Sequence, residues 1–279
     1  MSSSDVSQQR IDELERRCAR LQEQLDQVKV EQTTYLQNIS HQLVAPLNAI
    51  KWHIENLTAG RLTNIERAKK VLRSVYSQST IAVHLAKNFN LMSNLEADHA
   101  LTALKEPLQP VSLCRLVINL ADDFQPQGWD RNIQISVDHN NFDKAPDVLA
   151  MKPLISQVFS NIIENAVKYS DNESVIKIDG HFDPKNDAVI VNITSKGIPL
   201  PQNIAKVFER SFRSEQAKNK YPAGTGFGLY IAQRIVVIHQ GSISAQMTAR
   251  GEAVFTVSLS VRALEGKARL RDPKDRTSR

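Results

Sequence analysis

The N-terminal part of the sequence repeats apolar residues every seven positions, which restricts it to a long helix with one apolar seam. Two interleaved rows carry the repeat: Ile11, Cys18, Leu25, Gln32 and Ile39, and Leu14, Leu21, Val28 and Tyr35. Because the intervening positions are charged or polar, the pattern predicts a two-stranded coiled coil over residues 11–38. A single amphipathic helix packed on its own domain is the alternative. Residues 1–10 are polar, and we expect them to be disordered.

The apolar stripe then changes phase. After Ile39 it steps by four residues and continues as Leu43, Leu47, Ile50, Ile54 and Leu57. Such a step locally unwinds a supercoil. His41 lies on neither stripe, so we expect its side chain to face solvent. Pro46 follows and is expected to kink the helix, because proline removes a backbone hydrogen bond.

A second helical stripe follows a turn near Ala59-Gly60. Its members are Ile65, Ala68, Leu72, Val75, Ser79, Ala82, Ala86 and Phe89. Two long helices joined by a short loop form a hairpin with one apolar face uncovered. Two copies would bury these faces as a four-helix bundle. The sequence therefore predicts a homodimer that is formed through residues 39–98.

The pattern of apolar and polar residues changes after the hairpin. Pro107 and Pro110 indicate a linker over residues 99–110. Beyond it, a helical pattern spans residues 152–169, and alternating patterns typical of strands cover 133–137, 174–178, 188–193, 241–247 and 253–259. The predicted class is α+β, with helices packed on a largely antiparallel sheet over residues 111–262.

Composition excludes several functions. No run of about 18 apolar residues predicts a transmembrane segment, and Met1 to Asp5 do not resemble a secretory signal. Two cysteines, Cys18 and Cys114, make no disulfide framework, so a cytoplasmic protein is expected. The net charge of +5 lies mostly in residues 263–279, interpreted as a disordered basic tail. A contact of the tail with a partner or membrane surface is the alternative. We expect no nucleic-acid binding.

Polar side chains on the helix at 152–169 form a candidate binding face. Asn161 and Asn165 are four residues apart and share that face. An asparagine carbonyl oxygen is a hard ligand that magnesium accepts beside waters and phosphates. Lys168 is one turn further and could reach a phosphate, and Tyr169 could lie against a base or a ribose. Surface residues without a ligand are the alternative interpretation.

A glycine-rich segment precedes another apolar helix. Gly224, Gly226 and Gly228 alternate with Thr225 and Phe227, and Leu229 opens the helix. Glycine permits close backbone approach, and the free N–H groups of a helix N-terminus attract phosphate. A flexible turn is the alternative.

The segment before these glycines has the composition of a lid. Residues 214–223 are polar and contain Lys218 and Lys220. Phe208 and Phe212 would anchor its base. Arg213 is a candidate phosphate contact, although a surface salt bridge would also explain it.

These motifs, in this order, resemble those of the sensor histidine kinases of two-component signalling over about residues 32–262. The matching segments are Ser40 to Leu47 (phospho-acceptor), Asn161 to Tyr169 (asparagine motif), Gly197-Ile198-Pro199 (first glycine motif), Val207 to Arg213 (phenylalanine motif) and Gly224 to Leu229 (second glycine motif). The resemblance implies a coiled-coil signalling helix, a dimeric phosphotransfer hairpin and a catalytic ATP-binding domain of the Bergerat type, which is related to DNA gyrase.

The resemblance also implies a reaction. His41 would attack the γ-phosphate of ATP, Asn165 would hold Mg²⁺, and Lys168, Arg213 and the glycine-loop amides would offset phosphate charge. The phosphohistidine would then donate to an aspartate in the receiver domain of a response regulator. An upstream sensor protein or domain would act through the N-terminal coiled coil.

Three positions depart from the family pattern. Gln42 stands where the family usually has an acid, and it cannot take a proton. Ala45 replaces a Thr or Asn that positions water, so weak or absent phosphatase activity is expected. Ile193 occupies the position of the aspartate that binds the adenine amino group, although Asn192 or Thr194 could replace it through a local shift. The alternative to an active kinase is therefore a pseudokinase or dimeric phosphotransfer scaffold that regulates a partner kinase.

Overall fold

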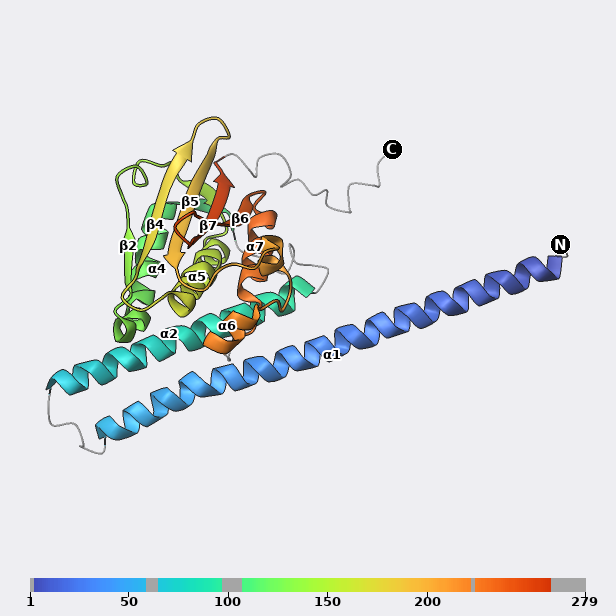
Figure 1. Ribbon diagram of the computed structural model, residues 1–279, viewed down its shortest axis with the longest axis horizontal. Helices are drawn as coiled ribbons and strands as arrows, with labels where there is room; N and C mark the ends of the chain where they lie inside the picture. The colour runs from blue at the N-terminus through green and yellow to red at the C-terminus, as the bar shows by residue number, and fades with distance from the viewer. Residues whose placement is uncertain (1–2, 59–64, 97–106, 222–223, 262–279) are drawn as a thin grey trace.

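Two long antiparallel helices form the N-terminal third of the protein. In the computed structural model, which describes residues 3–58, 65–96, 107–221 and 224–261, α1 spans Ser3–Thr58 and α2 spans Ile65–Glu96 (Figure 1). The helix α1 runs through Pro46 without interruption and includes most of the ten residues expected to be disordered. The turn at 59–60, most of the expected linker and the basic tail lie outside the described residues.

The hairpin leaves apolar side chains uncovered, as its sequence pattern predicts. Leu47 and Ile54 on α1 are 54% and 46% exposed, and Leu72 and Val83 on α2 are 57% and 53% exposed. Leucine and isoleucine in such a row are typical of a face that a second protein surface covers. Among the helices that the structure describes, none has the length and apolar character needed to cross a membrane.

The C-terminal half contains a five-stranded sheet in the order β2-β4-β5-β7-β6. Its strands are β2 (Gln134–Val137), β4 (Val175–Asp183), β5 (Ala188–Lys196), β7 (Glu252–Ser260) and β6 (Ser242–Met247). Only β2 and β4 pair in parallel, and the other neighbours are antiparallel. Two short strands, β1 (Gln109–Val111) and β3 (Val148–Ala150), pair separately. The α+β class and the largely antiparallel sheet expected from the sequence are confirmed.

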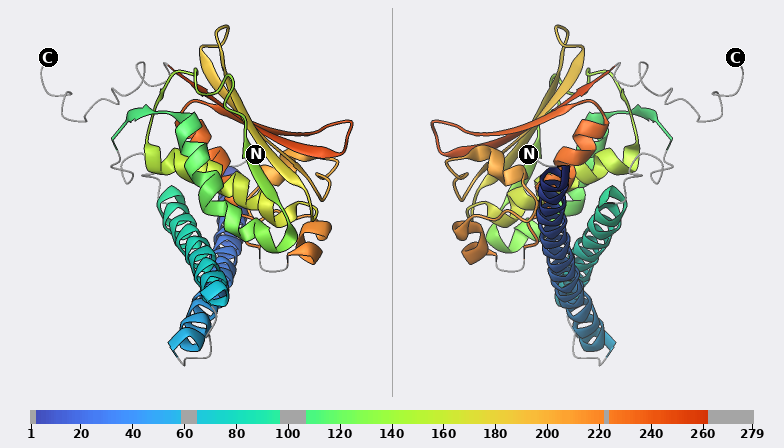
Figure 2. Two further views of the ribbon diagram at one scale, coloured as in Figure 1. Left: turned by 90° about the vertical axis from the view of Figure 1, so that its left-hand side faces the viewer. Right: turned by 90° about the vertical axis from the view of Figure 1, so that its right-hand side faces the viewer.

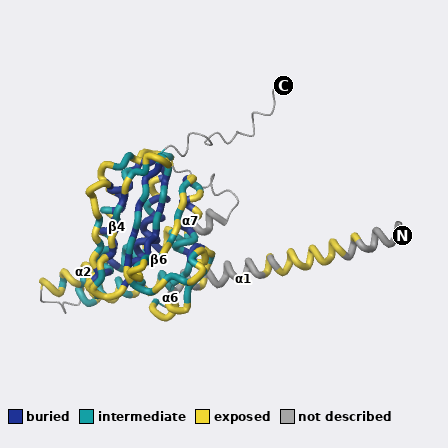
Figure 3. The backbone as a smooth tube through the Cα atoms, turned by 45° about the horizontal axis from the view of Figure 1, so that its top comes forward, coloured by how far each residue is buried: buried dark blue, intermediate teal, exposed yellow. Residues whose placement is uncertain are grey.

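Three helices cover one face of the sheet: α4 (Leu113–Gly128), α5 (Lys152–Tyr169) and α7 (Gly228–Ile238) (Figures 1 and 2). Buried and more exposed residues alternate along β4 and along the second half of β7, as expected for a sheet with one face on these helices and the other toward solvent. Figure 3 colours the backbone of the domain by this burial. The sequence analysis did not predict α4. Its N-terminus is capped by Ser112, whose side chain accepts a hydrogen bond from the backbone N–H of Arg115.

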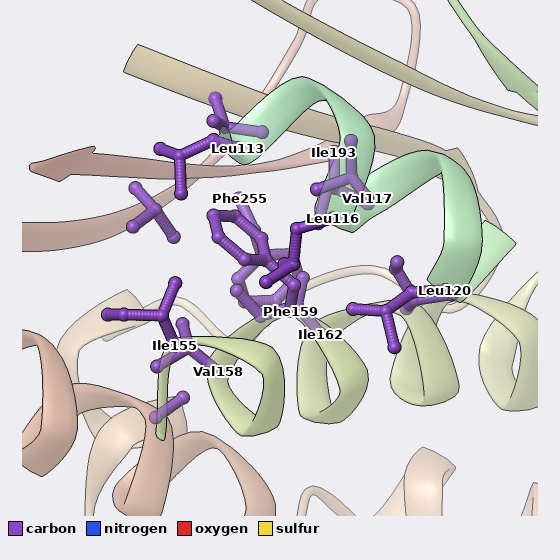
Figure 4. Close-up of a cluster of buried hydrophobic side chains, with 14 of the residues drawn as sticks. Leu113, Leu116, Val117, Leu120, Ile155, Val158, Phe159, Ile162, Ile193 and Phe255 are labelled. Carbon is purple, nitrogen blue, oxygen red and sulfur yellow. The ribbon is translucent and has the colours of Figure 1, made fainter. Parts of the chain in front are cut away.

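The core lies between the helices and the sheet. Figure 4 shows leucine and valine side chains of α4 above Ile155, Phe159 and Ile162 of α5, with Ile193 of β5 beside Val117 and Phe255 of β7 between the two helices. Full burial of each such side chain contributes about 1.5–3 kcal/mol to folding. This core fixes α5, which carries most of the candidate site.

Smaller elements close the domain. Two 3-10 helices span Trp129–Arg131 (η1) and Ile204–Phe208 (η2). The predicted lid contains a short helix, α6 (Glu215–Lys220), which Ser214 caps at its N-terminus. The hairpin packs on the domain through α2, which contacts α4, α5 and α7 and buries its Leu85 and Leu91.

Candidate functional site

One pocket brings together most of the predicted site residues. It lies between α5, the segment after β5, the lid and the N-terminus of α7, over a floor formed by Ser195, Ala253 and Phe255. The predicted residues that line it are Gln42, Asn165, Lys168, Tyr169, Gly197, Arg213, Thr225, Gly226, Gly228 and Leu229. Segments separated by more than 180 residues therefore meet at one site.

Four predicted residues are not among the lining groups. Asn161 and Phe227 are buried, and Gly224 lies beside the pocket. His41 lies in α1, but its side chain is not among those that the structure describes. Its neighbour Gln42 lines the pocket, so α1 passes the pocket at the position of the predicted phospho-acceptor.

The glycines give the pocket its shape. A Cβ atom on Gly197 would lie 2.1 Å from the backbone oxygen of Tyr169, so only glycine lets β5 approach the end of α5. Gly226 has a φ of 75°, and a Cβ there would also lie 2.7 Å from the backbone carbon of Ser211. The helix α7 follows at Gly228 with no side-chain cap on its N-terminus. Its N-terminal N–H groups are therefore oriented to bind an anion.

Asn161 does not face the pocket. It is 1% exposed, and its Oδ1 accepts a hydrogen bond of 2.9 Å from Nδ2 of Asn88 on α2. Its Oδ1 also lies 3.3 Å from the position that a Cβ on Gly228 would occupy. Asn161 thus supports the N-terminus of α7 from behind, whereas Asn165 remains in the pocket lining.

Lys168 has a protein partner at the wall of the pocket. Its Nζ lies 2.8 Å from Oε1 of Glu164 and 5.0 Å above the ring of Tyr221. Burial alone would lower the pKa of Lys168, but the charge of Glu164 outweighs burial and raises this pKa above its ordinary value. The ammonium group is therefore charged at neutral pH and adjoins the pocket.

Glu164 is a residue that the sequence analysis missed. It lines the pocket, is 5% exposed and places Oε2 3.0 Å from Nε2 of His84 on α2. Burial would raise the pKa of Glu164, but Lys168 and His84 together hold it well below its usual range. The spacing of Glu164 and Lys168, four residues apart on a helix, was the available signal.

Arg213 holds the lid in this structure. Its Nη2 donates hydrogen bonds to the backbone oxygens of Ala217, at 3.1 Å, and Tyr221. A Cβ on Gly224 would lie 2.9 Å from this guanidinium, so Gly224 leaves room for Arg213. The predicted phosphate contact is therefore also a structural element of the lid.

Lys220 fastens the lid to the end of α5. Its Nζ donates to the backbone oxygens of Tyr169 and Ser170 at 2.8 and 2.9 Å. Two carbonyls at the C-terminus of a helix are a favourable partner for a cation. Lys220 thus keeps α6 close to the pocket.

The register of β5 decides which way the side chain points at position 193, where the family has its adenine-binding aspartate. Ile193 is 1% exposed and belongs to the core in Figure 4. Asn192 and Thr194 alternate with it and so point to the other face of the sheet. Asn192 donates to Asp179 and accepts from Thr256, both at 2.9 Å. The expectation that Asn192 or Thr194 replaces the adenine-binding aspartate is therefore wrong for this structure, and Ser195 is the polar side chain on the pocket floor.

Comparison with known proteins agrees with this geometry. Residues 151–263 match the family described as "Histidine kinase-, DNA gyrase B-, and HSP90-like ATPase". The domain that carries the pocket thus has the features of this ATPase class, and the resemblance to sensor histidine kinases is confirmed.

Particular relatives are histidine kinases by name. The chain is 28% identical over 228 residues to the histidine protein kinase SaeS of Staphylococcus epidermidis. This alignment covers 80% of this chain and 62% of SaeS. It is 26% identical over 233 residues to the sensor histidine kinase WalK of Bacillus subtilis, which covers 80% of this chain and 35% of WalK. The chain therefore spans less than two thirds of these relatives. The crystal structure of full-length ShkA in complex with AMPPNP shares the fold, with a TM-score of 0.53 at 20% identity over 80% of this chain and 45% of ShkA.

Proposed function

We propose that this chain is an ATP-dependent protein-histidine kinase that phosphorylates itself on His41. The observation that carries the proposal is the position of Gln42, the next residue to His41, in the lining of the pocket that also contains Asn165 and Lys168. A phospho-acceptor on α1 and a nucleotide in this pocket would be neighbours. The names of the similar proteins support the same activity.

The pocket suits a purine nucleotide with a polyphosphate. The adenine would lie over Ser195, Ala253 and Phe255, which combine a hydroxyl group with apolar surface. The phosphates would bind the backbone N–H groups at Gly226 and Gly228, because the N-terminus of a helix favours anions.

Two cations and one amide complete the phosphate site. Lys168 and Arg213 would neutralise phosphate charge, and both line the pocket. Asn165 offers a carbonyl oxygen to Mg²⁺, which would offset the charge of the phosphates. Arg213 holds the lid by two carbonyl contacts, so we expect nucleotide binding to redistribute these hydrogen bonds.

The transfer step needs a neutral imidazole. A ring nitrogen of His41 with a free lone pair would bond to the γ-phosphorus while the bond to the β-phosphate oxygen breaks and ADP leaves. An unperturbed histidine is mostly neutral near pH 7. Gln42 can accept a hydrogen bond from the other ring N–H but cannot remove its proton, so we expect slow autophosphorylation.

Partners of the whole protein follow from the same proposal. The exposed apolar residues of α1 and α2 support a homodimer. The phosphoryl group would pass to an aspartate of a response-regulator receiver domain, and an upstream sensor would act through the predicted coiled coil. Weak or absent phosphatase activity toward the regulator, expected from Ala45, and a cytoplasmic location stay predictions.

The alternative is a pseudokinase scaffold with impaired ATP binding. One observation favours it, since the core position of Ile193 leaves no carboxylate for the adenine amino group. A missing buried polar contact of this kind costs about 1–3 kcal/mol of binding. The scaffold would regulate a partner kinase through the dimeric hairpin.

Incubation with γ-labelled ATP and Mg²⁺ decides between the two functions. The purified chain and its His41→Ala variant are compared at ATP concentrations up to the millimolar range. Acid-labile label on the wild type, absent from the variant, is the expected result. Absence of label on both proteins would favour the scaffold.

A further inference from the structure

A polar stripe on α5 faces the hairpin within an otherwise apolar interface. Gln157, Asn161, Glu164 and Lys168 follow the spacing of one helix face. The first three are no more than 5% exposed. Burying four polar side chains on one face is costly unless partners satisfy them.

The helix α2 supplies these partners through His84 and Asn88. Gln157 donates from Nε2 to Oδ1 of Asn88 at 2.9 Å and lies 3.0 Å from Nδ1 of His84. Asn88 in turn donates to Asn161 at 2.9 Å. We name His84, Asn88, Gln157, Asn161, Glu164 and Lys168 the α2–α5 polar network.

The hydrogen bonds of the network favour one tautomer of His84. The tautomer with its proton on Nε2 fits two of these contacts, because Nδ1 can then accept from Gln157 and Nε2 can donate to Oε2 of Glu164 at 3.0 Å, while Nδ2 of Asn88 lies 3.3 Å from the same Nε2. The His84 ring of α2 therefore links Gln157 to Glu164, two residues of α5. Phe124 closes the other side of the His84 ring with an edge contact at 5.8 Å between centroids.

Glu164 is the branch point of the network. One carboxylate oxygen accepts from His84, and the other lies 2.8 Å from Nζ of Lys168, which lines the nucleotide pocket. A side chain with both oxygens engaged has few alternative rotamers. The position of Lys168 is therefore coupled to the contact between α2 and α5.

We propose that Glu164 is a positioning residue, which fixes Lys168 for phosphoryl transfer while His84 of the docked hairpin fixes Glu164. This inference rests on the proposed kinase function. The carboxylate also places a negative charge near the expected phosphates, which opposes ATP binding. Glu164 should therefore favour turnover without favouring ATP affinity.

The first test is the Glu164→Gln variant, which keeps the shape and removes the charge. We expect kcat of autophosphorylation to fall about 10- to 100-fold because Lys168 loses its orientation. The KM for ATP and the calorimetric Kd of Mg·ATP should stay unchanged or decrease. A merely structural role would instead lower the unfolding temperature and raise KM. Unchanged kcat, or a fall in kcat with a rise in KM, would overturn the proposal.

Variants of His84 test the coupling through the hairpin. His84→Phe removes the donor to Glu164, so it should lower kcat by about as much as Glu164→Gln does. In the double variant His84→Phe/Glu164→Gln, kcat should be less than about twofold lower than in Glu164→Gln alone. His84→Gln can donate to Glu164 and accept from Gln157, so it should restore kcat. Full additivity, or no difference between the two His84 variants, would contradict the coupling.

Tyr76→Phe is the matched control for docking. It removes the 2.7 Å hydrogen bond from Tyr76 to Asp123 of α4, which joins the same two domains outside the network. It should leave kcat within about twofold of the wild type. If the wild type itself is not labelled on His41, the proposed function is wrong, and this inference, which depends on it, is wrong as well. A labelled wild type with unchanged variants refutes the inference alone.

Discussion

Replacement of Gly197 by alanine should disrupt the junction between β5 and α5. The new Cβ would lie 2.1 Å from the backbone oxygen of Tyr169 and 2.8 Å from Cα of Ser170. Both neighbours are backbone atoms, which cannot rotate away. Ser170 also forms a β-bridge with Gly197, and Ile198 donates to the same Tyr169 oxygen at 3.3 Å.

The expected cost has two parts. A separation of about 3 Å requires one backbone segment to move by roughly 1 Å, and overpacking of this kind costs about 1–3 kcal/mol. The oxygen of Tyr169 accepts from Ile198 and Lys220, and weakening these bonds adds about 1 kcal/mol. A loss of about 3 kcal/mol lowers the unfolding temperature of a domain of this size by roughly 6–12 °C.

Thermal unfolding of the full chain measures this loss, with Gly251→Ala as the control. Gly251, unlike Gly197, has a positive φ, of 73°, but a Cβ there meets nothing within 4 Å. Its strain alone costs about 1–2 kcal/mol. If Gly197→Ala unfolds no lower than Gly251→Ala, the steric argument for the first glycine motif is wrong.

Three further predictions follow from single contacts. Ile193→Asp restores the family residue but buries a carboxylate in the core, so it should lower the free energy of unfolding by more than about 3 kcal/mol. A denaturation midpoint near that of the wild type would contradict this. Burial lowers the pKa of His239, so the unfolded chain alone binds this proton as pH falls below about 6.5. The stability from neutral His239 is complete above that pH and is lost below it, and denaturant titrations of His239→Gln should show a flatter acid limb. Lys220→Ala removes two bonds to α5, so amide exchange in α6 should rise about tenfold while the unfolding temperature falls by only about 2–4 °C.

Sequence patterns predicted the elements whose contacts are local. The helical stripes predicted both hairpin helices, a further helical pattern predicted the range of α5, and alternation predicted the main strands. The motifs located Asn165, Lys168 and the glycine loop in the pocket lining. These features depend on periodicity and on glycine chemistry, which a sequence displays directly.

Features that depend on distant partners were missed. Glu164 looks like an ordinary helix-surface acid in the sequence, and only the approach of His84, 80 positions earlier, makes it a buried pair. Asn161 is predicted to contact the nucleotide, whereas in the structure it lies outside the pocket lining and accepts a hydrogen bond from Asn88. Which face Asn192 takes depends on the register of β5, which its pairing with β4 and β7 sets.

The space beside Gly224 links two positions of the sequence. A Cβ at 224 would lie 2.9 Å from the guanidinium of Arg213, which supplies the three nearest atoms and would have to shift, and no left-handed backbone adds to this restriction. A shorter residue at 213 would therefore remove the requirement for glycine at 224. Variation at these two positions should be correlated among descendants of this chain, so that side chains at 224 become acceptable only after arginine is lost at 213.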